Sequence, residues 1–193
     1  MHGHLPTRAA VCEPSRVDGL VILEVPAARF NELEPLWRAL YDHHNEVTPH
    51  LRDRARPFAR AWVSRRRTEG RWLETEPDSF VLAVQDSDRY VGYAFVRVRS
   101  GAGFAESWRV SDPLADLATL SVLPEFRGQG IGSALMDAVE SRLEEIGIAD
   151  MAIGVIATNH EAIPFYERRG AVPFVTQFIQ RVEPNHEGAQ TTD

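Results

Sequence analysis

Glycine is concentrated in one short run near the middle of this 193-residue chain, next to an arginine. The run consists of Arg127, Gly128, Gln129, Gly130, Ile131 and Gly132. Glycine lets the backbone turn sharply and lets a ligand approach it closely. If a helix follows, its first N–H groups have no partner within the helix and carry the positive end of its dipole, so they bind phosphate oxygens, and an arginine adds a planar cation. The run therefore predicts a phosphate site, although close packing alone would also select glycine.

The flanking residues predict the strand and the helix that such a turn needs. Residues 117–123 are a short apolar run with β-branched members, and Pro124 ends it. From Ile131, apolar residues recur every three to four positions as far as Ile146. The turn is not a P-loop, since no Gly-Lys-Ser/Thr follows, and it misses the dinucleotide fingerprint, since Ser133 replaces the last glycine.

The strand and the turn together resemble the acyl-CoA signature of the GNAT superfamily of N-acetyltransferases. That signature is Arg/Gln-x-x-Gly-x-Gly/Ala after a strand that ends Leu-x-Val-x-Pro, and this chain fills its positions with Leu120, Val122, Pro124, Arg127, Gly130 and Gly132. A second segment resembles the family pattern Asn-x-x-Ala-x-x-x-Tyr-x-x-x-Gly-Phe at Asn159, Ala162, Tyr166 and Gly170. It departs from that pattern at Ala171, where phenylalanine is usual, and at Pro164. The resemblance is strong over residues 117–182 and weaker before them.

The resemblance implies the α/β (α+β) class and the GNAT fold, a mixed, mostly antiparallel sheet of about six to seven strands flanked by helices. Two parallel strands, 116–123 and 151–157, would splay apart and take the cosubstrate acetyl-CoA between them, and no metal is implied. Strand backbone groups would pair with the pantetheine arm, the loop 127–132 would hold the pyrophosphate, and Asn159 would bind the arm. The implied coenzyme contacts are Leu120, Val122, Arg127, Gly128, Gln129, Gly130, Ile131, Gly132, Ser133, Asn159 and Tyr166.

The resemblance also places Tyr166 near the sulfur, where the chemistry suits a phenol. Attack of an amine on a thioester expels a thiolate, and a phenol with a pKa of about 10 can protonate it at neutral pH. We expect Tyr166 to be the general acid, although a core aromatic residue would show the same spacing. The incoming amine must lose a proton, and the candidates for the base are Glu106, in a predicted loop, and Asp116, at the start of the central strand. Both could instead be surface acids.

Two adjacent histidines and an acid follow the first predicted helix. His43, His44 and Glu46 lie in the region that covers the acceptor side of the cleft in the family, so the resemblance implies substrate contacts there. Histidine also titrates near neutral pH. Exposed loop-end residues remain an alternative. So does a metal site, although adjacent histidines seldom point the same way and no third ligand is obvious.

The composition is that of a soluble globular protein. Apolar residues make up 44% and charged residues 25% of the sequence, and the net charge is -7. The acidic balance argues against nucleic acid and is compatible with a cationic substrate. The single cysteine, Cys12, excludes an internal disulfide and a cysteine metal cage. No apolar run reaches the roughly 18 residues of a membrane span, and no signal-peptide core is present, so we expect a cytoplasmic protein without a membrane partner.

The remaining pattern predicts one domain over residues 17–183, between a flexible segment 1–16 and a disordered tail 184–193. Before the central strand, the predicted elements are a strand at 20–25, helices at 28–43 and 49–67, and a hairpin of strands at 80–84 and 90–98. After it, Asn159 would cap a short helix and residues 171–182 would close the sheet. The arginine-rich face of the second helix is a solvated surface or a site for an acidic group.

We therefore expect an N-acetyltransferase that moves an acetyl group from acetyl-CoA directly to a primary amine of a small molecule rather than of a protein. The lack of a nucleophile near the predicted cleft favours direct transfer over a covalent enzyme intermediate. The alternative is a non-catalytic, regulatory acyl-CoA-binding module that keeps the same phosphate loop. A homodimer is compatible with the sequence, and the acceptor amine is not specified by it.

Overall fold

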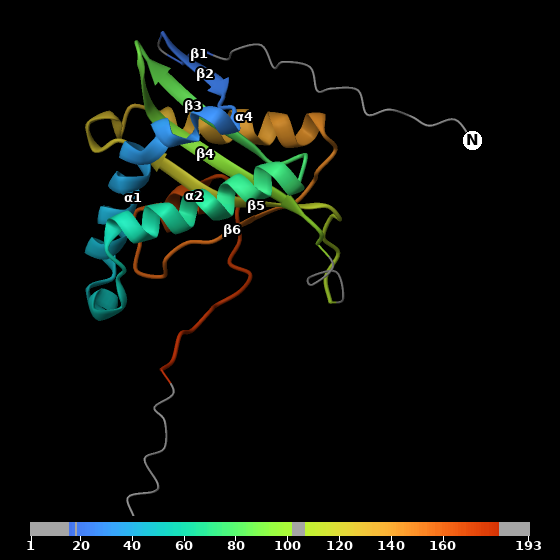
Figure 1. Cartoon of the computed structure of the whole chain (residues 1–193). Coiled ribbons are helices and arrows are strands. Elements are labelled where there is room, and N and C mark those ends of the chain that lie inside the picture. Colours follow the sequence, from blue (N-terminus) through green and yellow to red (C-terminus); the bar gives the residue numbers. More distant parts are fainter. Residues whose placement is uncertain (1–15, 18, 102–106, 182–193) are drawn as a thin grey trace, which may run out of the picture. The chain divides into compact units, whose positions relative to one another are not determined.

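The computed structural model describes residues 16, 17, 19–101 and 107–181 (Figure 1). The chain divides into two compact units, an amino-terminal unit that ends at Asn159 and a carboxy-terminal unit that begins at His160. Glu106, nearly all of the segment 1–16 and the tail 184–193 lie outside the described residues.

Six strands of the described residues form one sheet in the amino-terminal unit, and their order in space follows the sequence (Figure 1). The strands are β1 (Arg16–Val17), β2 (Leu20–Glu24), β3 (Phe80–Asp86), β4 (Arg89–Arg99), β5 (Leu114–Val122) and β6 (Met151–Ile153). Neighbours run antiparallel except β5 and β6, which run parallel. The expected mixed, mostly antiparallel sheet flanked by helices is confirmed, and so is the β3–β4 hairpin.

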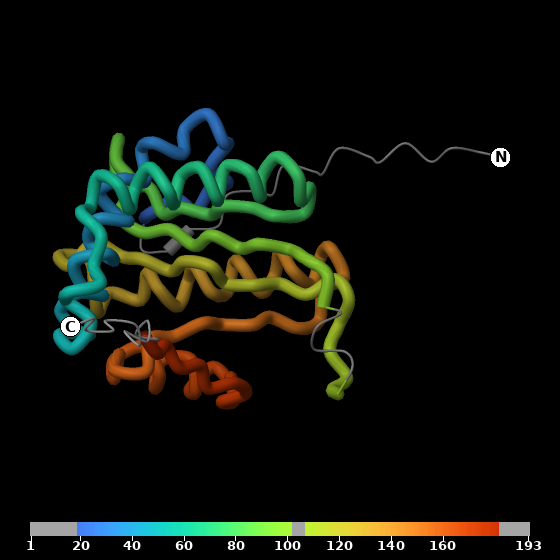
Figure 2. Tube along the Cα trace, turned by 60° about the horizontal axis from the view of Figure 1, so that its bottom comes forward, coloured from blue at the N-terminus to red at the C-terminus, as the bar shows by residue number. Residues whose placement is uncertain are grey.

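Helices cover both faces of this sheet. Helices α1 (Glu34–Val47) and α2 (Phe58–Thr75) lie on one face and α4 (Ile131–Glu145) on the other, as Figure 2 shows. Successive residues of a strand face opposite sides. On β4, Tyr93 packs with Trp62 of α2, whereas a Cβ on its neighbour Gly92 would lie 3.0 Å from Ile131 Cγ2 of α4. The missing side chain at Gly92 therefore lets α4 approach the sheet closely.

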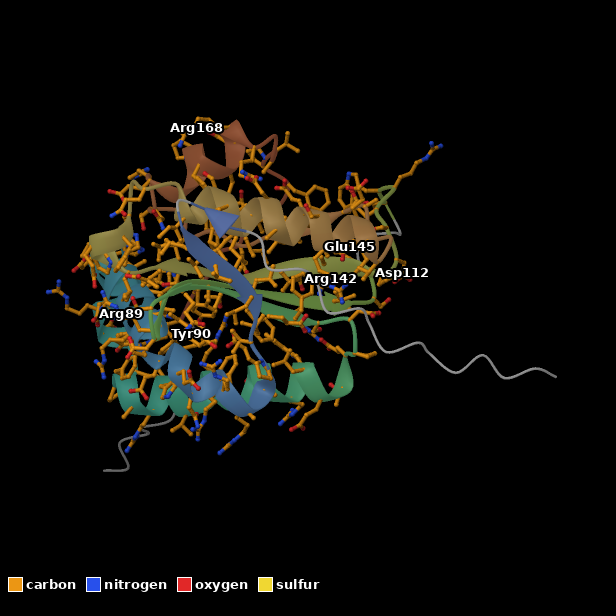
Figure 3. All side chains as sticks on the ribbon, turned by 90° about the horizontal axis from the view of Figure 1, so that it is seen from above. Arg89, Tyr90, Asp112, Arg142, Glu145 and Arg168 are labelled. Carbon is orange, nitrogen blue, oxygen red and sulfur yellow. The ribbon has the colours of Figure 1, made fainter. Side chains whose placement is uncertain are left out.

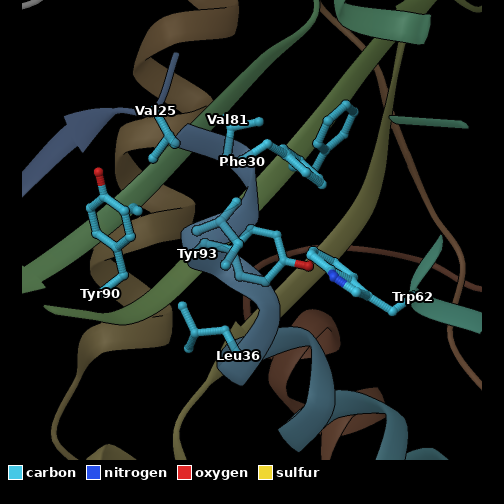
Figure 4. Packing of buried hydrophobic residues seen from close by; sticks show 10 residues of the cluster. Val25, Phe30, Leu36, Trp62, Val81, Tyr90 and Tyr93 are labelled. Atoms are coloured by element: carbon cyan, nitrogen blue, oxygen red, sulfur yellow. The ribbon is translucent and has the colours of Figure 1, made fainter. Parts of the chain in front are cut away.

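An aromatic cluster holds α1 and α2 against the sheet (Figure 4). Phe30 stacks on Trp62, with ring centroids 5.9 Å apart and planes 8° apart, and meets Phe95 of β4 edge-on at 6.2 Å. Trp37 of α1 lies 5.7 Å from Trp62, measured between ring centroids. Buried aromatic side chains contribute large apolar areas and specific ring geometry. The cluster thus fixes the position of α1, whose outer face lines a pocket described below.

The two predicted helices before β3 each divide at a proline. The predicted helix 28–43 is a 3₁₀ helix, η1 (Ala27–Leu33), followed by α1, which has Pro35 in its first turn. The predicted helix 49–67 is a 3₁₀ helix, η2 (Pro49–Arg54), followed by α2, which starts after Pro57 and runs on to Thr75. Before α2 the backbone is extended, with ψ values of 130° at Ala55 and 137° at Pro57, so the helical path breaks there. Before α1 the backbone stays helical, with φ of -53° and ψ of -44° at Glu34, and Pro35 fits the first turn because its missing N–H would have no helical partner there. The predicted boundaries were therefore wrong, although helices form in both regions.

Helix α4 follows the prediction. It begins at Ile131, directly after Gly130, and Gly147 behind it adopts a φ of 75°, as a glycine after a helix end does. Arg142 and Glu145 pair on its last turn with an N–O distance of 3.1 Å (Figure 3).

The chain after β5 and α4 departs from the prediction in three places. Strand β6 covers only residues 151–153 of the predicted 151–157. Helix α5 (Ala162–Arg168), in the carboxy-terminal unit, is preceded by Glu161 at its cap position, so Asn159 does not cap it. The predicted closing strand at 171–182 is absent from residues 171–181, which have no regular secondary structure. A strand needs a neighbour for its hydrogen bonds, and the described part of this unit contains no other strand.

Candidate active site

Strand β5 runs on after its parallel partner has left it. The ladder between β5 and β6 ends where Leu117 lies opposite Ile153, while β5 continues to Val122. Further along, the hydroxyl of Thr158 donates to the carbonyl oxygen of Val47 at the end of α1. The chain after β6 thus turns toward α1 and not along β5. The predicted splay between the two parallel strands is therefore present, and it begins after Leu117.

The N–H groups of Leu120 and Val122 point toward the edge that β6 leaves. Leu123 donates its N–H to the carbonyl of Val91 in β4 at 2.9 Å. Alternate residues of a strand direct their N–H groups to opposite edges, so the two even-numbered residues face away from β4. None of the described strands pairs with this stretch of the edge. It offers two donors to a ligand, and their pairing with a pantetheine arm stays a prediction.

The turn after β5 needs glycine for conformational reasons. Gly128 and Gly130 adopt φ values of 74° and 80°, which other residues rarely adopt. A Cβ at either position would meet nothing within 4 Å, so packing does not explain these glycines. Just before the turn, the 3₁₀ helix η3 (Pro124–Phe126) contacts β4. Arg89 of β4 pairs with Glu125 at 3.7 Å and lies 5.2 Å from the centre of the Phe126 ring.

The amino end of α4 is a ready anion site. The first hydrogen bond of the helix joins Ala134 N–H to the Gly130 carbonyl at 3.0 Å, and no side chain caps the end. The earlier N–H groups of the helix, starting with Ile131, are thus without a helical partner. Arg127 is exposed at the start of the turn and donates Nε to the Val122 carbonyl at 3.2 Å. Unpaired N–H groups, a helix dipole and a cation together suit a diphosphate.

A pocket of about 380 Å³ lies between the outer face of α1 and the turn. Its lining residues are Pro35, Arg38, Ala39, Asp42, His43, Glu46, Pro124 and Arg127. Three residues singled out in the sequence, His43, Glu46 and Arg127, thus meet at one pocket. The sequence reasoning missed Arg38 and Asp42, although the spacing of four residues from Arg38 to Asp42 to Glu46 places all three on one helix face.

His44 is separated from this group. It does not line the pocket, and burial lowers its pKa to about 4, with smaller contributions from His43 and Arg65. The imidazole of His44 is therefore neutral at pH 7. The His43 and His44 rings lie 6.5 Å apart, so the two histidines have different surroundings although they are adjacent in sequence.

Of the two predicted base candidates, only Asp116 is described. Its carboxylate accepts two hydrogen bonds from Arg99, one of them 3.1 Å long. Asp116 also lies opposite Ala152, in the part of β5 that is still paired with β6. It therefore stands before the splay and is engaged in an ion pair. Glu106 lies outside the described residues.

The second predicted signature spans the end of one unit and the start of the next. Asn159 closes the amino-terminal unit, is buried, and donates its N–H to the Ile156 carbonyl at 2.8 Å. Tyr166 lies on α5 in the carboxy-terminal unit, with the Phe165 ring 5.1 Å from its own. Burial raises the pKa of Tyr166 to about 12, so the phenol keeps its proton at neutral pH.

Within the ranges that the structure describes, no three His, Cys, Asp or Glu side chains gather as metal ligands would. No helix there is long and apolar enough to cross a bilayer.

Two curated relatives indicate acetyl transfer. A mycothiol acetyltransferase of Kocuria rhizophila is 34% identical over 97 residues, which cover 49% of this chain and 30% of that protein. The [ribosomal protein bS18]-alanine N-acetyltransferase of Escherichia coli K12 is 33% identical over 89 residues, which cover 46% of this chain and 60% of that protein. The match to this chain thus spans less than two thirds of either relative.

Solved structures share the fold. The aminoglycoside N-acetyltransferase AAC(6')-Iy in complex with CoA has a TM-score of 0.56 and 16% identity, covering 84% of this chain and 99% of that one. A GCN5-related N-acetyltransferase from Ralstonia eutropha has a TM-score of 0.61 and 20% identity, covering 85% and 99%. The model of the acetyltransferase (GNAT) family matches residues 37–171, more than half of the sequence. With its splayed strands and uncapped helix behind a glycine turn, the chain belongs to the acetyltransferase (GNAT) family.

Proposed function

We propose that this protein transfers an acetyl group from acetyl-CoA directly to a primary amine of a small molecule. The observation that carries the proposal is the course of β5. The strand parts from β6 after Leu117, presents two edge donors, and leads through a glycine turn to the uncapped end of α4. A ligand with an amide-rich arm at one end and a diphosphate at the other matches this succession. A structural neighbour that holds CoA supports the same assignment.

The chain would hold the coenzyme mainly with its backbone. The first N–H groups of α4 and the guanidinium of Arg127 would bind the diphosphate, because charge-assisted hydrogen bonds are the strong ones. The N–H group of Val122 would pair with the arm, and that of Leu120 would face the acyl end of the coenzyme. Asn159 would complete the contacts from the end of the amino-terminal unit.

Bound acetyl-CoA supplies an acyl group that is already activated as a thioester. The task of the protein is then to orient it and to stabilise the charge that develops on its oxygen. A fixed near-attack arrangement can lower a barrier by about 7–11 kcal/mol. The edge N–H of Leu120, held in a strand, is a donor that needs no reorganisation to stabilise that charge.

The pocket between α1 and the turn, called the α1 pocket from here on, is the basis for proposing a small cationic acceptor. The carboxylates of Asp42 and Glu46 line it together with His43, and its volume of about 380 Å³ suits a small molecule. Similar proteins carry the names of mycothiol, ribosomal-protein and aminoglycoside acetyltransferases, so the family accepts both small and protein amines. Asp42 and Glu46 favour a cationic amine at their end of the pocket, which Arg38 and Arg127 also line.

Two proton transfers accompany the reaction. Tyr166 would protonate the leaving thiolate, and its raised pKa keeps the required proton in place. The raised pKa also makes the phenol a weaker acid, so the rate gain from Tyr166 must come mostly from its position next to the leaving thiolate. The base that takes the proton of the amine would be Glu106 or Asp116, directly or through water.

The test is thiol release from acetyl-CoA with a panel of polyamines, aminoglycosides, amino acids and peptides, beside calorimetric titration with coenzyme A. We expect micromolar to millimolar coenzyme binding and turnover with at least one polycationic small amine. Binding without turnover for every amine would favour a regulatory acyl-CoA module. The absence of coenzyme binding would overturn the proposal.

A further inference from the structure

A charged pair lies beneath the point where the two parallel strands part. Glu69 of α2 has an exposed fraction of 0%, and Arg65, one turn earlier on the same helix, forms an ion pair with it. The Nη2 atom of Arg65 donates to Glu69 Oε1, to the hydroxyl of Thr119 and to the carbonyl of Ala118, the last at 2.8 Å. Thr119 in turn donates to Glu69 Oε1 at 3.2 Å. One nitrogen of Arg65 thus connects α2 to two successive residues of β5.

Ala118, whose carbonyl accepts from Arg65, lies where the pairing of β5 changes on both of its edges. On the β4 side, Phe95 pairs with Thr119 and the next residue, Val96, pairs with Leu117, so Ala118 is an extra residue in the ladder. On the β6 side, pairing ends at Leu117. Such a bulge leaves backbone groups unpaired and redirects the residues that follow it. The guanidinium of Arg65 binds one of these groups, two residues before Leu120.

Stability alone is a poor reason for this arrangement. Glu69 is fully buried, whereas Arg65 keeps 24% of its side chain exposed. Removing a charge from water costs several kcal/mol, and apolar residues of similar size often serve a core as well or better. Breaking such a pair is costly, which makes its geometry rigid. A buried ion pair therefore suits a place where the direction of a backbone group matters more than the free energy of folding.

We propose that Arg65 and Glu69 are positioning residues for acetyl transfer: by holding the carbonyl of Ala118 at the bulge, they fix the direction of the Leu120 N–H at the open edge. This inference rests on the proposed function for the role of the Leu120 N–H, although the geometric part can be measured without turnover. Neither residue needs to touch the coenzyme. A small rotation of this edge donor would move it away from the acyl oxygen, and a misplacement of about 1 Å can lower a rate about a hundredfold.

The pair also predicts a pH response in the neutral range. The groups around Glu69 are Arg65 on its own helix, Thr119 of β5 and Tyr93 of β4, and His44 of α1 is coupled to Arg65. Burial raises the pKa of Glu69 to about 7, against the opposing effects of Arg65 and Thr119. Burial also keeps Tyr93 protonated, and His44 titrates near pH 4, so neither changes charge near pH 7. Protonation of Glu69 as the pH falls through 7 would release Arg65 from its partner.

The decisive measurement follows the Leu120 amide itself. The sequence contains a single Thr-Leu step, Thr119-Leu120, so labelling threonine with ¹³C at the carbonyl and leucine with ¹⁵N selects one amide in the NMR spectrum. In the wild type this signal should shift with pH around 7. In Glu69→Gln, which keeps the shape but cannot titrate, it should not. If Glu69→Gln does not fold, Thr119→Val is the second variant. It removes only the hydroxyl that donates to Glu69, so it should change the pH midpoint at which the Leu120 signal shifts.

Turnover gives the second readout. We expect Glu69→Gln and Arg65→Lys to lower kcat about tenfold or more while KM for acetyl-CoA changes less than about threefold. Arg67→Lys, on the exposed side of the same helix, is the matched control and should match the wild type in both. A Leu120 signal that ignores pH, or that still titrates in a folded Glu69→Gln protein, would overturn the inference. A titrating signal in a protein without turnover would support the positioning pair and count against the proposed function alone.

Discussion

Comparison of Gly130→Ala with Gly147→Ala distinguishes the loss of stability caused by backbone strain from a loss of coenzyme affinity. Gly130 and Gly147 stand at opposite ends of α4, with φ values of 80° and 75°, and a Cβ would meet nothing within 4 Å at either position. The two substitutions therefore share one physical cost, the placement of an L side chain in the left-handed region. That cost is about 1–2 kcal/mol. Only Gly130 is next to the N–H groups proposed to hold the diphosphate.

The effect on affinity follows from the same strain. In Gly130→Ala the free turn can relax into a conformation with negative φ, and binding must then restore the original turn. Restoring the turn would make the binding free energy of the coenzyme less favourable by about 1–2 kcal/mol, which raises the dissociation constant about 5- to 30-fold. Gly147→Ala relaxes at the far end of the helix, and its dissociation constant should stay within about twofold of the wild type.

Denaturant unfolding and calorimetry with coenzyme A make the comparison. We expect both variants to lose unfolding free energy, by less than about 1–2 kcal/mol to the extent that the turn relaxes, and only Gly130→Ala to lose affinity. Equal affinities in the two variants would show that the turn does not bind the diphosphate. A loss of affinity in Gly147→Ala as large as that in Gly130→Ala would show that general loosening of α4, and not local geometry, controls binding.

The other predictions concern single ionisable groups. Tyr166→Phe should lower kcat about a hundredfold or more with an unchanged coenzyme dissociation constant, and equal turnover by thiol release would remove it as the acid. Asp42→Asn and Glu46→Gln should each raise KM for a polycationic amine about tenfold without changing KM for acetyl-CoA, since each loses a charge-assisted hydrogen bond. Burial raises the pKa of Glu69 from 4.5 to about 7, so the folded state binds its proton more tightly and stability falls as the pH rises from 4.5 to 7. The wild type should thus lose about 3 kcal/mol relative to Glu69→Gln over that range, measured by denaturant unfolding.

The turn and the helix that we propose for coenzyme binding were predictable because backbone geometry builds them. Positive φ values demand glycine, so Gly128 and Gly130 mark the turn in the sequence, and the apolar period after them marks the helix. The apolar run before Pro124 marks the strand. These are local signals, and each was read within about ten residues of the site it forms.

The rest depends on contacts between distant segments. Arg65 meets Ala118 across 53 positions, and Glu69 meets Thr119 across 50, so no local pattern reveals a buried pair on a helix whose other arginines are exposed. The strand predicted at residues 171–182 was wrong for a related reason, because a strand requires a hydrogen-bonding partner from another segment. Asn159 was assigned as a helix cap by its residue type, but the helix starts later, after Glu161.

The acceptor half is built from side chains, and its charge differs from that of the chain as a whole. The protein carries a net charge of -7, yet the α1 pocket holds two arginines and two carboxylates. Along α1, Arg38 and Glu46 are eight residues apart, about 12 Å at the rise of a helix. An acceptor would therefore experience a charge gradient along the pocket and not a uniform negative field. Its amine would be drawn toward Asp42 and Glu46 and its oxygen-rich parts toward Arg38, so we expect the separation of charges within the acceptor, more than its total charge, to decide which amines are acetylated.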